Sequence, residues 1–376
     1  MSPPDDRPLP LADLRVIDLS TVIAGPSVAR YLADFGADVI KVERPDGDSL
    51  RNMAWRDPRD GTGLWWKLAN RNKRFLALDL KVDADRDVLL GLIDEADALI
   101  ENFRPGTLER LGLAPEVLHA RNERLVITRI TGFGQKGPYA DRPGFASIAE
   151  AMSGYAAIAG DPAGPPLLPP IALTDEVAGL VGAFATMVAL HAGVGQVVDV
   201  SLLESLFQLM GPLISVYRLT GEQQARLGAG IPYTVPRGTY RCADERWVAV
   251  STSSDSVAGR VMRLIGVGDD PRFSTFAGRV QHREELDALV AAWIGARPLE
   301  EVVAEFGAAE AAIAPVMDME AIAADPHVAA IGMIAEVDGT PMQGLVARLS
   351  ATPGRLRWCG RPIDADGDWI RRHGWE

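Results

Sequence analysis

One carboxylate is the strongest candidate for chemistry in this sequence. Asp175 follows the segment PPIALT and precedes residues 176–192, EVAGLVGAFATMVALHA, an apolar stretch rich in Gly and Ala. This pattern predicts a closely packed helix that begins near Asp175. A carboxylate at a helix N-terminus is stabilised as the anion by free N–H groups and by the helix dipole. Two interpretations are open at this point: a plain N-cap, or a nucleophile that attacks an acyl carbonyl and forms a covalent intermediate.

The other common catalytic side chains have weaker support. The five histidines show no metal-ligand spacing, and neither H-E-x-x-H nor G-x-S-x-G occurs. Those histidines are His119, His191, His282, His327 and His373. Cys242 stands next to a predicted strand, where a packed thiol is more common than a nucleophile. We therefore expect no metal site and favour a carboxylate as the reactive group.

A glycine-rich loop matches part of a nucleotide-binding motif. Residues 132–137, GFGQKG, fit G-x-G-x-x-G and follow a predicted strand. Dinucleotide binding requires a helix to open at the third glycine, so that its N–H groups face the pyrophosphate. Pro138 and Pro143 follow instead, which predicts that no helix starts there. The segment is expected to be a glycine-rich active-site or structural loop.

Strand and helix patterns alternate in the first two hundred residues. Strand-like runs occur at residues 14–19, 37–42, 75–80, 98–100, 125–130 and 196–203, and helical segments at 27–35, 84–96 and 176–192. This alternation predicts a parallel α/β sheet, which binds ligands at the carboxyl ends of its strands. From residue 239 the pattern changes. A strand at 247–250 and amphipathic helices at 286–294 and 299–306 predict a smaller α+β unit.

Composition limits the classes of function. The chain has 376 residues, a net charge of −13 and 47% hydrophobic residues, which is typical of a soluble globular protein and argues against nonspecific nucleic-acid binding. The acidic, Pro-rich start does not resemble a signal peptide, and no uninterrupted apolar run reaches the ~18 residues of a membrane span. Two cysteines cannot form a disulfide framework. We expect a cytoplasmic protein with neither nucleic-acid nor membrane partners.

Residues 41–81 are locally basic. They carry ten lysines and arginines against six acids, in a chain that is otherwise acidic. This excess is compatible with a solvated surface or with a site for an anionic ligand, and composition does not separate the two interpretations.

Several motifs, in their order and spacing, resemble those of the family III CoA-transferases, the group of formyl-CoA transferase and carnitine CoA-transferase. They are VIDLS (16–20), AGP (24–26), FGADVIKVE (35–43), NKR (72–74), ENFRPG (101–106), TGFGQKGP (131–138), Asp175 with Gly179, and GQVVDV (195–200). The resemblance is strong over residues 11–205 and looser to about residue 330.

The resemblance implies a two-domain architecture and a dimer. A large Rossmann-like α/β domain would span residues 1–205 and be completed by 340–376. A linker at 206–230 would lead to an inserted small α+β domain at 231–328, and a return linker would follow at 329–339. Two such chains interlock like linked rings in a homodimer.

The resemblance also implies the chemistry. The nucleophilic aspartate of the family falls on Asp175, which would transfer CoA from an acyl-CoA to a carboxylic acid through a mixed anhydride and an aspartyl-CoA thioester. CoA is then a substrate, and no permanently bound cofactor is needed. Positions that match CoA contacts are Ile23, Ala24, Arg44, Leu78, Lys81, Asn102, Phe103, Arg104, Arg110, Gly144 and Phe145. Arg44 would contact phosphates, and Ile23 and Ala24 would lie near the thioester.

Two alternatives remain: an acyl-CoA racemase or isomerase of the same fold, and a non-catalytic CoA-binding protein. The related α-methylacyl-CoA racemases carry a histidine and an aspartate where this chain has Phe145 and Ala146. Because racemisation needs a second base, it is disfavoured. The presence of Asp175 within its motif argues against a non-catalytic role. Oxalate-using transferases have polar side chains at the positions of Ile23 and Ala146, so we do not expect oxalate as the acceptor.

Overall fold

A computed structural model describes residues 9–376. The acidic N-terminal residues 1–8, on which part of the signal-peptide argument rests, lie outside the described residues. Contacts divide the chain into two compact units. The large unit comprises the chain up to Tyr155 together with Pro169–Gly211 and His327–Glu376, and the small unit comprises Ala156–Leu168 and Pro212–Pro326.

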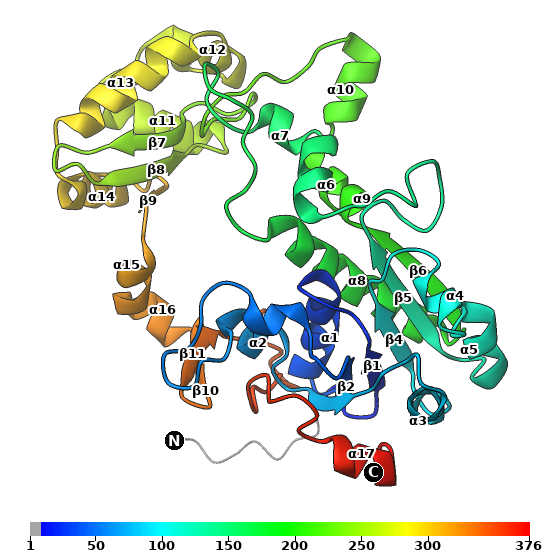
Figure 1. Cartoon of the computed structure of the whole chain (residues 1–376). Coiled ribbons are helices and arrows are strands. Elements are labelled where there is room, and N and C mark those ends of the chain that lie inside the picture. The colour runs from blue at the N-terminus through cyan, green and yellow to red at the C-terminus, as the bar shows by residue number, and fades with distance from the viewer. Residues whose placement is uncertain (1–8) are drawn as a thin grey trace. The chain divides into compact units, whose positions relative to one another are not determined.

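The large unit is built on a six-stranded parallel sheet (Figure 1). Its strands are β1 (Arg15–Asp18), β2 (Asp38–Glu43), β3 (Arg74–Ala77), β4 (Ala98–Glu101), β5 (Val126–Thr131) and β6 (Gln196–Ser201). The six strands expected from the sequence are confirmed. Their order is β3-β2-β1-β4-β5-β6, which is the Rossmann order. The order reverses between β1 and β4, and ligands of such sheets bind outside the carboxyl ends of the strands at this point.

Helices cover both faces of this sheet. On one face lie α1 (Ala24–Asp34) and α8 (Leu173–Ala192). On the other face lie α3 (Asp83–Ile93), α5 (Pro115–Arg121) and α17 (Gly367–His373). Successive residues of a strand point to opposite faces, so Val16 joins the first core and Ile17 the second. The near-continuous apolar strands in the sequence reflect this burial on both sides.

Shorter elements occupy the connections of the large unit. They are η1 (Ser49–Asn52), α2 (Leu64–Ala69), α4 (Thr107–Arg110), α6 (Ala146–Met152), α9 (Leu202–Phe207) and η2 (Gln208–Met210), with α7 (Tyr155–Ile158) at the boundary to the small unit. A further helix, α16 (Pro326–Ala330), leads to the antiparallel hairpin of β10 (Ile334–Val337) and β11 (Thr340–Gln343).

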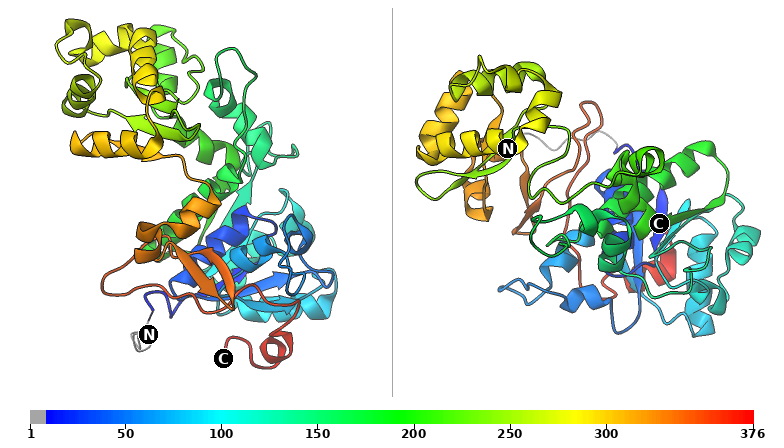
Figure 2. Two further views of the ribbon diagram at one scale, coloured as in Figure 1. Left: turned by 90° about the vertical axis from the view of Figure 1, so that its left-hand side faces the viewer. Right: turned by 90° about the horizontal axis from the view of Figure 1, so that it is seen from above.

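The C-terminal segment packs against the first part of the large unit, as Figure 2 shows by its red and blue colours. The Trp358 indole donates to the carbonyl oxygen of Lys73 at 2.8 Å, and Asp366 accepts from the Phe75 N–H at 2.9 Å. Buried Arg71 pairs with Asp34 and also donates to the carbonyl oxygen of Gln343. These contacts attach residues 327–376 to the sheet at β3.

The small unit has a separate core around a three-stranded antiparallel sheet. The strands are β7 (Arg237–Arg241), β8 (Trp247–Ser251) and β9 (Ile313–Pro315). Its helices are α10 (Leu213–Thr220), α11 (Asp255–Leu264), η3 (Pro271–Phe273), α12 (Phe276–Gln281), α13 (Arg283–Gly295), α14 (Leu299–Ala308) and α15 (Met319–Ala324). The strand at 247–250 and the two amphipathic helices expected from the sequence are confirmed.

Helix α8 is long and apolar enough to cross a membrane by length and composition alone, the one such helix among residues 9–376. In the fold it packs on α1 and on the sheet, which is the position of a core helix. Its glycines permit the close approach: a Cβ at Gly179 would lie 2.8 Å from the Ser27 Cβ, and one at Gly182 would lie 2.6 Å from the Val28 side chain.

Candidate active site

A cavity of about 430 Å³ lies at the carboxyl ends of β1 to β4. It is lined by Leu19, Thr21, Val42, Glu43, Arg44, Gly47, Asp48, Ser49, Leu78, Asp79, Leu80, Lys81, Phe103, Thr107 and Leu111. Four positions that were expected to contact CoA are among these residues: Arg44, Leu78, Lys81 and Phe103. The cavity therefore combines apolar walls with two exposed cations, at the place where the topology predicts a ligand.

Asn102, Ile23 and Ala24 are not among the residues that line the cavity. The Asn102 amide accepts from the Thr21 N–H at 2.7 Å and donates to the Thr21 carbonyl at 2.8 Å. Both ends of the amide are thus engaged by backbone, so Asn102 acts on the cavity through Thr21. Ile23 and Ala24 are buried where α1 begins.

The remaining expected contacts lie outside the cavity lining. Arg104 and Arg110 are exposed, and Arg110 donates to the Thr107 hydroxyl at 2.8 Å. Phe145 precedes α6 and is 69% exposed, and Gly144 packs against the backbone of Gly132. None of these four residues lines the cavity, although Arg110 contacts the lining residue Thr107.

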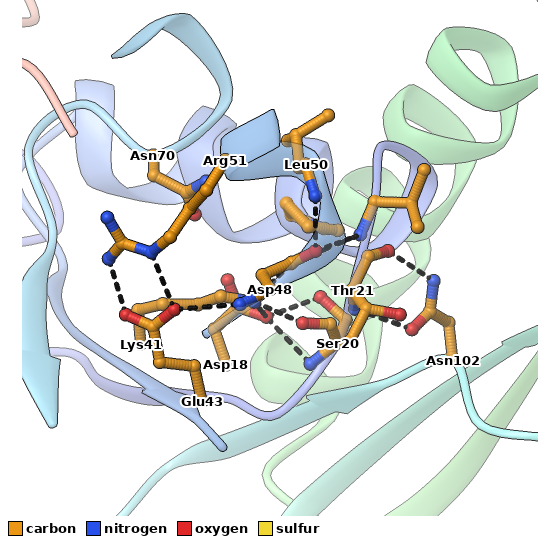
Figure 3. A network of polar contacts seen from close by, with 12 residues as sticks. Asp18, Ser20, Thr21, Lys41, Glu43, Asp48, Leu50, Arg51, Asn70 and Asn102 are labelled. Atoms are coloured by element: carbon orange, nitrogen blue, oxygen red, sulfur yellow. Dashed lines mark hydrogen bonds and ion pairs between the residues drawn. The ribbon is translucent and has the colours of Figure 1, made fainter. Parts of the chain in front are cut away.

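Most of the cationic side chains of residues 41–81 form ion pairs with acidic residues of the protein itself. Lys73 is fully buried and donates to Asp18 at 2.9 Å, and burial lowers its pKa to about 8 even though Asp18 opposes this shift. The Lys41 Nζ lies 3.7 Å from Asp18 and 3.6 Å from Asp48 (Figure 3). Ion pairs also engage Arg51, Arg59, Lys67, Arg71 and Arg74. The charge excess in the sequence is therefore mainly structural, and Arg44 and Lys81 are the cations that reach the cavity.

Asp175 lies in the first turn of α8 but is not its N-cap. The helix begins at Leu173 and the capping position is Ala172, so the plain N-cap interpretation is wrong. Among the described residues nothing forms a hydrogen bond or an ion pair with the Asp175 carboxylate. Burial, together with the carboxylates of Glu150 and Glu176, raises its pKa to about 6. The expected stabilisation of the anion by the helix dipole is thus outweighed.

The neighbouring carboxylate, Glu176, is fully engaged. It accepts from the Ser27 hydroxyl at 3.0 Å, from the Arg30 guanidinium at 2.9 Å and from the Tyr31 hydroxyl at 3.0 Å. All three donors lie on α1. Glu176 therefore joins α8 to α1, whereas Asp175 retains free lone pairs for an incoming group.

Glu150 is a residue of this site that the sequence analysis missed. It lies on α6, is 4% exposed and accepts from the Thr174 hydroxyl at 2.9 Å. In the described part of the chain it has no cationic partner. Burying a carboxylate without a cation is costly. Its signal in the sequence was a single acid among the small and apolar residues ASIAEAM.

The glycine-rich loop 132–137 is tied to the sheet. The next helix, α6, begins only at Ala146, which confirms that no helix opens at the third glycine. The Gly134 N–H donates to the Thr131 hydroxyl and the Gln135 N–H to Asp199, both at 2.9 Å. These two N–H groups of the loop are therefore already used within the protein. Over residues 9–376 there is also no cluster of three His, Cys, Asp or Glu residues that could hold a metal.

Comparison with known proteins identifies the family of the chain. Residues 11–366 match the model of CoA-transferase family III. The chain is 40% identical over 369 residues to succinyl-CoA–D-citramalate CoA-transferase of Chloroflexus aurantiacus, covering 94% of this chain and 91% of that protein. It is 33% identical over 373 residues to succinate–glutarate CoA-transferase of Agrobacterium fabrum, with coverages of 94% and 92%.

A solved structure shares the fold along the whole chain. The crystal structure of a CAIB/BAIF family protein from Brucella suis superposes with a TM-score of 0.86 and 30% sequence identity, covering 97% of this chain and 99% of that one. The protein therefore belongs to CoA-transferase family III and is a transferase that acts on CoA thioesters.

Proposed function

We propose that this enzyme transfers CoA from a dicarboxylic acyl-CoA such as succinyl-CoA to a four- or five-carbon dicarboxylate, with Asp175 as the covalent nucleophile. The observation that carries the proposal is the contrast in the first turn of α8. Glu176 accepts three hydrogen bonds, whereas the Asp175 carboxylate has no partner among the described residues and a pKa raised to about 6. At neutral pH most of it is ionised, poorly solvated and available to attack.

The proposed reaction proceeds by a balanced exchange of acyl groups. The Asp175 carboxylate attacks the thioester carbonyl, the C–S bond breaks, and CoA thiolate leaves a mixed anhydride. The thiolate then attacks the aspartyl carbonyl, which releases the donor carboxylate and forms an aspartyl-CoA thioester. The acceptor carboxylate attacks this thioester and displaces the thiolate. The thiolate finally attacks the acceptor's acyl carbonyl, so that acceptor-CoA forms and Asp175 is regenerated.

The cavity at β1 to β4 is the proposed site of the CoA nucleotide. Arg44 and Lys81 offer cations to its phosphates, and Leu78 and Phe103 offer apolar surface to its adenine. The proposed path to Asp175 runs past Thr21 and Ile23, because Ile23 belongs to the buried cluster against which Ala172, the residue before α8, also packs.

A dicarboxylic acceptor is supported by the relatives and by two loop arginines. The relatives described above are named for citramalate, succinate and glutarate. Arg104 and Arg142 are exposed, and neither forms an ion pair with another described residue. Arg142 lies 3.8 Å from the centre of the Tyr139 ring, which holds its guanidinium in place. Either arginine is a candidate to bind the second carboxylate.

A matrix of acyl-CoA donors and carboxylate acceptors, read by mass spectrometry, tests the function. We expect succinyl-CoA with a C4–C5 diacid to give the new thioester without added nucleotide or metal. After denaturation in the presence of donor, a CoA or acyl adduct should map to Asp175. Transfer that is absent from every pair, or an Asp175→Asn enzyme that transfers as well as the wild type, would reject the proposal.

We further propose that the enzyme is an interlocked homodimer in a reducing cytoplasm. Side chains of α8 such as Phe184 are exposed, at 72% for Phe184, and Leu219 of α10 is 85% exposed. A second copy would cover these apolar side chains. Both cysteines, Cys242 and Cys359, are buried and unpaired, which fits a reducing compartment. Sedimentation velocity at nanomolar concentration should show only dimer, and a folded monomer would contradict the proposal.

A further inference from the structure

Val22 has a backbone conformation that is unfavourable for its residue type. Its φ is +66°, in the left-handed region, where a β-branched side chain is an outlier. It lies between Thr21, which lines the cavity, and Ile23, which precedes α1. Such conformations persist only where the surrounding structure imposes them, and they cluster at functional sites. The side chains that bind the backbone around Val22 therefore determine whether this conformation persists.

Three side chains hold the backbone from Ser20 to Val22 (Figure 3). Asp48 accepts from the Val22 N–H, with its two carboxylate oxygens 3.3 and 3.2 Å from the nitrogen. Asn102 binds both the N–H and the carbonyl of Thr21. Lys41 donates to the carbonyl oxygen of Ser20. Every residue of this short segment thus has a side-chain partner from a different strand or loop of the sheet edge.

Asp48 is itself rigidly placed. Its side chain is fully buried, accepts from the Leu50 N–H at 2.9 Å and lies 3.6 Å from the Lys41 Nζ. Its N–H donates to Glu43 at 3.0 Å, and the Glu43 carboxylate is paired with Arg51. A carboxylate held in this way presents its oxygens to Val22 without needing to reorganise.

The segment connects the two parts of the site. Thr21 and Asp48 line the cavity. Val22 packs against the buried cluster of Ile23, Leu50, Trp66, Ala69 and Phe75, and Ala172, which precedes α8, packs against the same cluster. A change in the Val22 conformation would therefore move the cavity wall and the surface on which the start of α8 rests.

We propose that Asp48 is a positioning residue, which holds Val22 in the left-handed conformation and thereby fixes the wall past which the CoA thioester reaches Asp175. The inference rests on the proposed function for its effect on CoA, but the conformational part stands by itself. Asp48 contacts backbone rather than the reacting atoms, so its role is indirect. The strain at Val22 makes this role testable, because glycine adopts the same conformation without strain.

The experiment compares Asp48→Asn, Val22→Gly and the double variant, using CoA titration calorimetry and hydrogen exchange of the peptide over residues 19–28. Asparagine is nearly isosteric but offers one acceptor oxygen where Asp48 uses two. We expect Asp48→Asn to raise the Kd of CoA about tenfold and to speed exchange at Thr21 and Val22. Adding Val22→Gly should bring the Kd back to within about threefold of wild type, because the left-handed conformation then no longer needs the clamp.

Glu245→Gly provides the matched control. Glu245 also has a left-handed backbone, with a φ of +69°, but it lies in the small unit. Combined with Asp48→Asn it should not restore CoA binding, so a rescue there would show a general gain in stability and would overturn the proposal. An unchanged Kd and exchange rate in folded Asp48→Asn would overturn it too, as would a folded double variant without rescue. If wild type does not bind CoA, the proposed function fails, and the exchange data still decide the role of Asp48.

Discussion

Two carboxylates of the large unit, the fully buried Asp18 and the partly buried Asp175, have opposite electrostatic surroundings. At the carboxyl end of β1, Asp18 forms ion pairs with Lys73 at 2.9 Å and with Lys41 at 3.7 Å. In the first turn of α8, burial raises the pKa of Asp175, and the carboxylates of Glu150 and Glu176 raise it further. The pKa of Asp18 is therefore lowered, and the pKa of Asp175 is raised.

The difference separates a positioning role from a reactive one. A buried ion pair with complete hydrogen bonds fixes local geometry, and breaking it leaves an uncompensated charge. A buried carboxylate without a cation destabilises the fold, but its lone pairs remain available for chemistry. Substitutions in the two regions should therefore have different effects.

The largest expected effect is on catalysis at Asp175. Asp175→Asn removes the proposed nucleophile, so we expect transfer to fall below about 1% of wild type while CoA binding changes less than threefold. Steady-state transfer assays and CoA calorimetry measure the two quantities. Glu176→Gln is the matched control, since Glu176 is already engaged by α1, and should retain at least a tenth of the activity. Equal losses in both variants would remove the distinction between the two carboxylates.

The second prediction concerns the buried ion pairs of Asp18. Asp18→Asn leaves Lys41 and Lys73 without their common carboxylate, and we expect the free energy of unfolding to fall by about 3 kcal/mol or more. Denaturant titration measures the loss. Asp94→Asn, which breaks the half-exposed pair with Arg121, should cost less than about 1 kcal/mol. Comparable losses would show that the buried network contributes no more than a surface pair.

The third prediction follows from the raised pKa of Asp175. Its folded-state pKa of about 6 lies above its ordinary value of 3.8, so the folded protein favours the protonated form. The associated stability is present below about pH 4 and is lost as the pH rises through about 6. At pH 8 the free energy of unfolding of Asp175→Asn should therefore exceed that of wild type by about 2–3 kcal/mol, and near pH 4 the two values should be equal. Denaturant titrations at both values test this, and a gain that does not depend on pH would contradict it.

The fourth prediction distinguishes exposed from buried cations. Arg44 lines the cavity, its side chain is 72% exposed, and its nearest acid, Asp46, is equally solvated. Arg44→Ala should weaken CoA binding by about tenfold or less without a change in stability. Calorimetry with CoA and with dephospho-CoA identifies the phosphate concerned. Arg56→Ala, at an exposed arginine outside the cavity lining, should leave the affinity unchanged.

The smallest effect is expected at Glu150. Glu150→Gln keeps an oxygen that accepts from Thr174 but removes the charge that helps to raise the pKa of Asp175. The acid limb of kcat/KM against pH should move down by up to about one unit, because burial alone still keeps the pKa high. Glu176→Gln should move it less, since Glu176 contributes less than Glu150 to the raised pKa of Asp175. An acid limb that stays in place or moves up would exclude Glu150 as a determinant of the Asp175 pKa.

The sequence predicted those features that depend on local pattern. Short apolar runs that alternate with helical segments indicated all six strands of the large sheet, and the prolines after Gly137 correctly excluded a helix there. The ordered motifs correctly indicated the family. The resemblance implied CoA contacts at Arg44, Leu78, Lys81 and Phe103, and these four residues line one cavity at the common edge where parallel strands end.

Tertiary structure alone decided what each charge does. The sequence does not show which lysines and arginines are buried. Lys41 and Lys73 are buried in ion pairs, whereas Arg44 is solvated. The sequence placed Asp175 at a helix start, but its raised pKa comes mainly from burial by the surrounding fold, and then from the carboxylates of Glu150 on α6 and of Glu176. The strain at Val22 and its partners Asp48 and Asn102 likewise depend on contacts between strand ends. Electrostatic environment is set by distance and burial, and those are properties of the packed chain.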